Sequence, residues 1–346
     1  MKENLFFLIS GEHPTLPSSE VKAILEAEEI SYRVRKQSFK LLSLEAPVEA
    51  LQKVDHRSSM CEACGIELFE CGGDLRDILS RINETDFYKV ITGNKSFAVR
   101  IRRAAGTSKD LRRDVLERKI GEAILRATRN TVVNLKKPDR VFLGILSDGR
   151  FLFGIMTHAR QRGSIAARRP RRRPFFHPAT MPPKLARCMV NLARPKPSQL
   201  LLDPFCGIGG ILIEAGLVGC RVVGCDIKLE MAKGCLRNLE FFGISPVGVA
   251  IADARNPPFS PVHCVVTDPP YGKSASTLGL TTTGLLKSFL HTAGDLLLED
   301  GFLSVASPKT VGVSEFGRDA DLKLVERHYV YVHRSLTREI AVFRKR

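Results

Sequence analysis

The sequence predicts an α/β protein whose C-terminal half is a mainly parallel, doubly wound sheet. From residue 200 onward, apolar runs typical of strands alternate with segments typical of helices, a pattern that favours parallel strands joined by crossovers. A glycine-rich turn directly follows the first of these runs, at the position where doubly wound folds bind ligands. We expect strands at residues 200–203, 221–225, 247–251, 263–267 and 301–306, and an antiparallel edge formed by residues 322–332 and 340–344.

The N-terminal half predicts two smaller units that mix helices and strands. In the first unit, residues 1–70, apolar runs predict strands at 5–9, around 34, at 39–44 and at 60–69. Helices are expected from a cap at Ser18 or Ser19 to residue 29, and at residues 48–55.

The second unit, residues 71–157, follows the same mixed pattern. We expect a helix from residue 75, a strand at 96–102, and a helix opened by Ser108 or Asp110 that ends at residue 127. A hairpin of residues 141–145 and 150–156 is expected around the Asp148-Gly149 turn.

A basic linker is expected at residues 158–183, because arginines and prolines there show no helical or strand periodicity. Pro183 suits the first position of a helix that ends near residue 193. The third domain is therefore predicted to span residues 184–346.

Composition argues against a secreted, membrane-spanning or fibrous protein. The chain has 346 residues, of which 44% are hydrophobic and 26% charged, so it can bury cores and is not disordered as a whole. Its apolar runs are far shorter than the roughly 20 residues of a membrane span, and the run at 5–9 lacks a signal-peptide pattern. An odd number of cysteines, nine, predicts reduced thiols and a cytoplasmic location.

The positive charge is concentrated in the middle of the chain. The net charge is +16, and residues 149–202 carry twelve Lys and Arg without a single Asp or Glu. Together with the basic stretch at 95–148, this predicts a polyanionic partner such as nucleic acid. A solvated basic linker is the alternative interpretation.

The first motif is the glycine turn at residues 203–210, which read Asp-Pro-Phe-Cys-Gly-Ile-Gly-Gly. Glycines allow the backbone to turn tightly and to approach a ligand where a Cβ would collide. Asp226, the next acidic residue at a strand end, suits the two hydroxyls of a ribose. Alone, this motif is weak evidence, and a tight turn that binds nothing is the less favoured alternative.

The second motif is Thr-Asp-Pro-Pro-Tyr-Gly at residues 267–272. In a sheet of strand order 3-2-1-4-5, the strands that end at Asp203 and Asp268 are neighbours, so both motifs meet in one crevice. The Asp268 carboxylate and a prolyl carbonyl can accept the two N–H bonds of a ring-bound amine, and Tyr271 offers a face for stacking. An exposed turn ended by proline is the alternative.

These motifs identify residues 200–346 as resembling class I S-adenosylmethionine-dependent methyltransferases with a Rossmann-like fold. Residues 173–178 (Arg-Pro-Phe-Phe-His-Pro), 184–193, 203–207 and 333–338 resemble the tRNA guanosine-10 N2-methyltransferases of archaea and their eukaryotic relatives. The resemblance implies a ferredoxin-like domain at 1–70 and a THUMP domain, an α+β RNA-binding module, at 71–157. It also implies N2 methylation of a guanosine in tRNA by direct displacement, after extrusion of the paired base.

The resemblance implies roles for individual residues, carried over motif by motif. Asp268, Pro269 and Tyr271 would hold guanine. The expected S-adenosylmethionine-binding residues are His177, Pro178, Asp203, Phe205, Cys206, Gly207, Gly209, Asp226, Ile227, Asp253, Ala254 and Asp268. The expected tRNA-binding residues are Arg100, Arg102, Lys109, Arg112, Arg113, Arg168, Arg169, Arg171, Arg172 and Arg173.

No metal site is expected, because Cys61 and Cys64 lack a second cysteine pair and are better explained as buried thiols. Residues 274–283 predict a mobile loop over the substrate or an ordinary surface loop. Some relatives require a small zinc-binding activator that covers an apolar sheet edge, and others act alone. Residues 217–218 and 222–223 are consistent with such an edge and equally with the core.

Three alternative functions remain open at this point. One is methylation of another guanosine in tRNA or rRNA, and another is methylation of adenine N6 or cytosine N4 in DNA. The third is a non-catalytic RNA-binding scaffold, which the intact Asp203 and Asp268 motifs argue against.

Overall fold

The computed structural model describes residues 2–91, 96–104, 106, 111–128, 130–159, 165–178, 180–271 and 281–346, apart from the side chain of residue 318. The chain divides into two compact units. The first comprises Met1–Ser18, Glu29–Asp55 and Cys61–Arg160. The second comprises Ser19–Glu28, His56–Met60 and Gln161–Arg346, so it is assembled from three separate stretches of the sequence.

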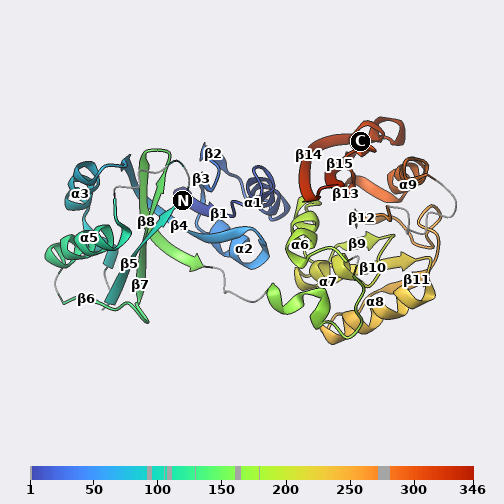
Figure 1. Ribbon diagram of the computed structural model, residues 1–346, viewed down its shortest axis with the longest axis horizontal. Coiled ribbons are helices and arrows are strands. Elements are labelled where there is room, and N and C mark those ends of the chain that lie inside the picture. The colour runs from blue at the N-terminus through green and yellow to red at the C-terminus, as the bar shows by residue number, and fades with distance from the viewer. Residues whose placement is uncertain are drawn as a thin grey trace. The chain divides into compact units, whose positions relative to one another are not determined.

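An eight-stranded sheet of order β2-β3-β1-β4-β8-β7-β5-β6 forms the first unit (Figure 1). Its strands are β1 (Lys2–Ile9), β2 (Arg33–Gln37), β3 (Leu41–Pro47), β4 (Cys61–Gly72), β5 (Ser96–Arg103), β6 (Val132–Val133), β7 (Arg140–Ser147) and β8 (Arg150–Ala159). The helices along this part of the chain are α1 (Leu16–Ala27), α2 (Glu49–Arg57), α3 (Leu75–Glu84), α4 (Phe87–Ile91) and α5 (Arg113–Ala127).

Aromatic packing holds the half of this unit that contains α3 and α5. The rings of Phe142 and Phe153 stack with centroids 5.6 Å apart, and Phe87 meets both rings edge-on. The β7–β8 hairpin turns at Asp148 and Gly149, whose φ angles of 50° and 72° are those of the expected two-residue turn.

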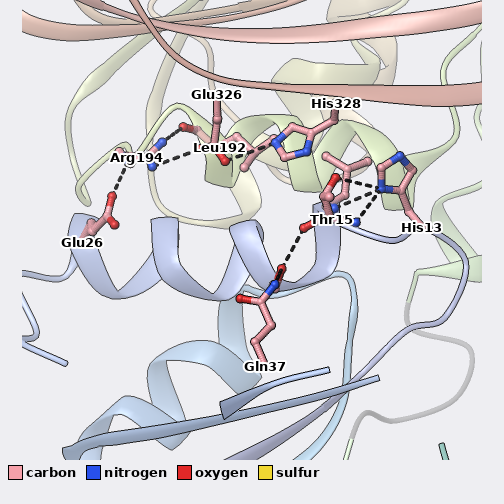
Figure 2. A network of polar contacts seen from close by, with 10 residues as sticks. His13, Thr15, Glu26, Gln37, Leu192, Arg194, Glu326 and His328 are labelled. Atoms are coloured by element: carbon pink, nitrogen blue, oxygen red, sulfur yellow. Dashed lines mark hydrogen bonds and ion pairs between the residues drawn. The ribbon is translucent and has the colours of Figure 1, made fainter. Parts of the chain in front are cut away.

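The strands and helices expected in the N-terminal half of the chain are confirmed, with two differences at the starts of helices. Helix α1 begins at Leu16 rather than after Ser18 or Ser19, because His13 Nδ1 accepts the N–H groups of Thr15 and Leu16 at 3.2 and 3.0 Å (Figure 2). Helix α5 begins at Arg113, whereas the expected caps at residues 108 and 110 lie outside the described residues.

The two N-terminal segments share one sheet. Strand β4 pairs with β1 on one side and with β8 on the other, so strands from residues 1–70 and 71–157 are hydrogen-bonded neighbours. The division into a ferredoxin-like domain and a THUMP domain therefore stays a prediction. The expected linker contains two short 3₁₀ turns, Ala166–Arg168 and Pro170–Arg172.

The second unit has a seven-stranded sheet of order β11-β10-β9-β12-β13-β15-β14 (Figure 1). Its strands are β9 (Leu200–Asp203), β10 (Arg221–Asp226), β11 (Gly248–Ile251), β12 (Val262–Thr267), β13 (Leu297–Pro308), β14 (Leu322–His333) and β15 (Leu336–Lys345). Its helices are α6 (Pro183–Leu192), α7 (Gly210–Leu217), α8 (Leu229–Phe241) and α9 (Thr282–Leu296).

This sheet confirms the predicted strand order and its antiparallel edge. Strands β9 to β13 pair in parallel in the order 3-2-1-4-5, and β13, β15 and β14 pair antiparallel. Apolar side chains such as Val265, Phe289 and Phe343 are fully buried in its core. The order places the carboxyl ends of β9 and β12 side by side.

Polar contacts bind residues 19–28 and 56–60 into the second unit. The buried Glu20 carboxylate accepts the N–H groups of Ser59 and Met60, both at 2.8 Å, and the Asn191 side chain at 2.9 Å. Arg194 pairs with Glu26 at 2.6 Å and with Glu326 at 3.1 Å (Figure 2). These residues therefore form part of the same packed body as α6.

Candidate active site

The two sequence motifs meet at the carboxyl ends of neighbouring strands. Leu202 of β9 lies opposite Val265 of β12. Beyond this pair, one residue along β9 and two along β12, the Thr267 hydroxyl donates to Asp203 Oδ1 at 2.7 Å, and both side chains are buried. The prediction that these distant segments meet at one edge of the sheet is therefore confirmed.

The glycine turn leaves open space beside its backbone. Gly207 and Gly209 have φ angles of 49° and 81°, in the left-handed region that favours glycine. A Cβ added at Gly207 would meet no described atom within 4 Å, so this side of the turn is accessible to a ligand. Asp226 Oδ2 accepts the Gly207 N–H at 3.0 Å, which holds the end of β10 against the turn.

Asn238 is a positioning residue that the sequence analysis missed. Its side chain is fully buried in α8 and donates to the carbonyls of Ile208 and Phe175 at 2.9 and 3.0 Å. Its Oδ1 accepts the Phe175 N–H at 3.0 Å. Asn238 thus ties the glycine turn to residues 173–178, the stretch that carries His177.

Phe175 itself packs on α8 at a residue without a side chain. A Cβ added at Gly234 would lie 2.4 Å from the Phe175 ring, so only glycine permits this contact. An internal glycine in a helix is a visible sequence signal of close approach, although it does not reveal the partner.

Burial perturbs the Asp203 carboxyl strongly. Desolvation raises its pKa to about 7, against the hydrogen bonds donated by Thr267 and by the Phe205 N–H. The negative charges of Asp268 and Asp226 raise this pKa further. A cationic group placed beside Asp203 would stabilise the carboxylate form.

Asp268 lies in a triad with Tyr271 and Arg338. The Tyr271 hydroxyl donates to Asp268 Oδ1 at 2.9 Å, and Arg338 Nη2 lies 3.3 Å from Oδ2. Arg338 Nε also donates to the Tyr271 hydroxyl. Burial raises the pKa of Asp268, while the charge of Arg338 and the Tyr271 hydrogen bond oppose this shift. Arg338 comes from β15 and ends the stretch 333–338 that carries part of the family resemblance, but the sequence analysis assigned it no role.

The other expected cofactor residues lie in three kinds of environment. Asp253 is partly buried and pairs with Arg255, which lowers the pKa of its carboxyl. The buried side chains are those of Cys206, Ala254 and Pro269. The more exposed ones are those of Phe205, His177, Pro178 and Ile227.

The basic residues of the first unit differ in availability. Arg102 and Arg113 are exposed, and Arg112 is exposed but pairs with Asp114 at 2.7 Å. Arg100 donates to the Leu135 carbonyl at 2.7 Å, which commits part of its guanidinium to the protein. Residue 109 lies outside the described residues.

An open depression of about 490 Å³ lies at the start of α5. It is lined by Arg103, Arg112, Arg113, Asp114 and Glu117. Two of its lining residues are expected tRNA ligands, which gives this part of the first unit a concave surface with three arginines.

The arginine run at 168–173 requires a correction. Arg169, Arg171 and Arg172 are exposed as expected for phosphate ligands. Arg168 instead forms a two-pronged ion pair with the buried Glu214, at 2.8 and 2.9 Å. Arg173 is only 5% exposed. The ion pair of Arg168 and the burial of Arg173 therefore contradict the prediction that these two residues bind RNA phosphates.

Of the two interpretations of residues 217–218 and 222–223, the structure supports the core. Val218, Val222 and Val223 are buried in the core of the second unit, and Leu217 is only partly exposed. They do not form an exposed apolar edge, because β10 is an internal strand of the sheet.

All nine cysteines are buried and none forms a disulfide. Within the described part of the chain, His, Cys, Asp and Glu side chains form no group of three that would hold a metal ion. No described helix has the length and apolar character needed to cross a lipid bilayer. Most of the expected loop at 274–283 lies outside the described residues.

Comparison with known proteins places this site in a family. Residues 170–340 match the family described as "RMKL-like, methyltransferase domain", and residues 88–236 match one described as "DNA methylase". A tRNA (guanine(10)-N2)-dimethyltransferase from Methanothermobacter thermautotrophicus is 37% identical over 343 residues, which cover 99% of each chain. The chain belongs to the tRNA (guanine(10)-N2)-dimethyltransferase family.

Solved structures agree with a class I methyltransferase-like fold for this family member. TrmN from Thermus thermophilus has a TM-score of 0.58 at 20% identity and covers 99% of this chain and 100% of its own. The protein SMU.472, solved in complex with SAH, has a TM-score of 0.59 at 15% identity and covers 100% and 98%. Membership of the tRNA (guanine(10)-N2)-dimethyltransferase family confirms the resemblance inferred from the motifs.

Proposed function

We propose that the chain transfers a methyl group from S-adenosylmethionine to the exocyclic N2 of guanosine 10 in tRNA. The observation that carries this function is the Thr267–Asp203 hydrogen bond, which joins the glycine turn to the Asp-Pro-Pro-Tyr strand. The names of relatives that match nearly the whole chain support the same substrate and position.

The residues at the carboxyl ends of β9 and β10 fit the methyl donor. S-adenosylmethionine, when bound, supplies a methyl group on a positively charged sulfur. Asp203 would hold the donor's ammonium group, since burial leaves its carboxyl in need of a cation. Asp226, beside the open space at Gly207, would accept the ribose hydroxyls.

The Asp268 triad would position guanine. The lone pair of the exocyclic amine is delocalised into the ring, so the nitrogen is a weak nucleophile. Hydrogen bonds from this amine to Asp268 and to the Pro269 carbonyl would favour a pyramidal nitrogen whose lone pair points outward. Tyr271 and Arg338 hold the Asp268 carboxylate in a fixed orientation, which lowers the cost of arranging the reactants.

Exposed arginines would bind the tRNA backbone. Nucleotide 10 lies in a paired stem, so the base must be extruded, which costs a few kcal/mol. Contacts from Arg102, Arg113, Arg169, Arg171 and Arg172 to phosphates would offset that cost. We assign this role to the first unit as a THUMP-like module and to the exposed part of residues 166–172.

Cytoplasmic location and an activator subunit are further parts of this proposal. Nine buried cysteines without a disulfide support a reducing compartment. If an activator covers the sheet edge, the candidate surface is at β11 and the end of α8, where Phe241, Val247 and Ile251 are 53–59% exposed.

Incubation with labelled S-adenosylmethionine and unmodified tRNA, followed by mapping of the product, tests the function. We expect N2-methylated guanosine at position 10 and no label in duplex DNA. Asp268→Ala should lower the rate at least about 100-fold. Asp295→Ala, at an exposed position on α9, is the matched control and should keep the rate.

The same experiment separates the alternatives. Label on adenine or cytosine of DNA would favour the DNA methylase interpretation, although that family match ends before Asp268. Label at another guanosine would change the substrate position only. Cofactor binding without any transfer would indicate an RNA-binding scaffold.

A further inference from the structure

We infer that Arg173 forms the binding site for the α-carboxylate of the methyl donor. This inference rests on the proposed function, because it assigns the part of the donor that the acidic residues of the site leave without a partner. Arg173 stands two residues before Phe175 in the stretch that Asn238 fastens to the glycine turn.

The first line of support is a buried excess of positive charge. Arg168, Arg173 and Arg187 surround the carboxylate of Glu214, and Arg187 also feels the charge of the buried Glu20, whereas Arg173 feels that of Glu214 alone. Glu214 is fully engaged by two of them: Arg168 takes both oxygens at 2.8 and 2.9 Å, and Arg187 Nε donates to Oε2 at 2.8 Å. Burying a guanidinium without an anion is unfavourable, so Arg173, which forms no ion pair with Glu214, would be stabilised by a further negative group.

The second line of support is the hydrogen bonding of Arg173 itself. Its Nε donates to the Arg168 carbonyl at 3.0 Å, which orients the guanidinium plane. Both terminal nitrogens, Nη1 and Nη2, are buried and have no hydrogen-bond partner among the described residues. These two nitrogens form a fork that matches the two oxygens of a carboxylate.

The position of this fork identifies the ligand. A Cβ added at Gly210, the first residue of α7, would lie 3.5 Å from Arg173 Nη1. Helix α7 begins directly after the glycine turn, and its N-cap residue, Gly209, provides no side-chain cap. The same Cβ would lie 3.4 Å from Thr180 Cγ2, so Arg173 and Thr180 both border the start of α7. The free N–H groups and the dipole of a helix start attract anions, as does the guanidinium of Arg173.

A carboxylate of the donor suits this volume better than a phosphate of RNA. Arg173 is 95% buried, whereas a backbone phosphate needs an exposed cation such as Arg171 or Arg172. The amino-acid end of the donor is expected at the same glycine turn, where Gly207 borders open space. The donor's ammonium would then face Asp203 and its carboxylate Arg173.

Isothermal titration calorimetry on the full chain, without RNA, tests the inference. The probes are S-adenosylhomocysteine and its decarboxylated analogue, in which hydrogen replaces the α-carboxylate. We expect Arg173→Gln to weaken S-adenosylhomocysteine binding at least about 20-fold, the loss of a charge-assisted bidentate contact, and to leave the analogue unchanged. Arg173→Lys should restore part of the affinity.

Arg221→Gln is the matched control, because Arg221 is an exposed arginine at the opposite end of β10. It should change neither affinity. Equal weakening of both probes by Arg173→Gln would overturn the inference and indicate a structural role. Unchanged binding of both probes, with weaker tRNA binding, would overturn it in favour of a phosphate ligand. Because calorimetry measures binding of the donor's product and not methyl transfer, a wrong RNA substrate in the proposed function would not change this result.

Discussion

The buried carboxyl of Asp203 makes a specific prediction about pH. Its pKa of about 7 lies some three units above the ordinary value of 3.8. In the folded protein the carboxyl therefore keeps its proton over a pH range in which the unfolded chain has lost it. Between these two values, each pH unit should lower the free energy of unfolding by about 1.4 kcal/mol, up to a total of about 4 kcal/mol.

Asp203→Asn isolates this contribution, because asparagine keeps the oxygen that accepts from Thr267 but cannot ionise. Below about pH 4 the ionisation of Asp203 should cause no difference in the free energy of unfolding between the variant and the wild type. As pH rises toward 7, the variant should become progressively more stable than the wild type, and the difference should level off above pH 7. Urea denaturation of both proteins between about pH 4 and pH 8 measures it.

The same ionisation should control binding of the methyl donor's product. Because the ammonium group of S-adenosylhomocysteine favours the carboxylate form of Asp203, wild-type affinity should rise with pH up to about 7 and then level off. Asp203→Asn should bind more weakly and lack this dependence. Parallel pH profiles of the two proteins, in stability and in binding, would refute the argument from burial.

Three further predictions concern positioning and RNA contacts. Arg338→Gln should lower kcat about 10- to 100-fold in a methyl-transfer assay, because it removes the guanidinium that orients the Asp268 carboxylate, and calorimetry should show unchanged S-adenosylhomocysteine affinity. Weaker S-adenosylhomocysteine binding would instead place Arg338 in the cofactor site. Asn238→Ala should lower the free energy of unfolding, measured in urea, by about 2 to 3 kcal/mol and should weaken cofactor binding. No change in either quantity would show that Asn238 does not hold the glycine turn to residues 173–178. Arg171→Gln combined with Arg172→Gln should reduce the slope of log Kd for tRNA against log salt by about 1 per arginine in filter binding, whereas an unchanged slope would show that they touch no phosphate.

Strand order and the meeting of the two motifs could be predicted from sequence because both depend on local patterns. Alternating apolar runs determine a parallel sheet, and the residues that follow Leu202 and Val266 then share its carboxyl edge. That Asp203 and Asp268 lie at the ends of neighbouring strands can therefore be predicted without any knowledge of side-chain packing.

The residues that escaped prediction depend on tertiary contacts. Arg173 belongs to a run of arginines, and composition alone cannot separate the buried member of a run from its exposed neighbours. Asn238 lies in helix α8 and Arg338 in strand β15, and no periodic pattern in the sequence predicts which residues their side chains contact. Glu214 did leave a signal, since a lone acidic residue in the apolar helix Gly210–Leu217 calls for a buried cation.

The discontinuous second unit has a practical consequence for dissecting this protein. A fragment that starts at residue 161 would retain every residue of the site but lose Ser19–Glu28 and His56–Met60. Asn191 and Arg194 would lose their carboxylate partners from helix α1, Glu20 and Glu26. Removing the N-terminal half therefore damages the catalytic half as well, and loss of methyl transfer by such a fragment would not by itself measure the contribution of tRNA binding.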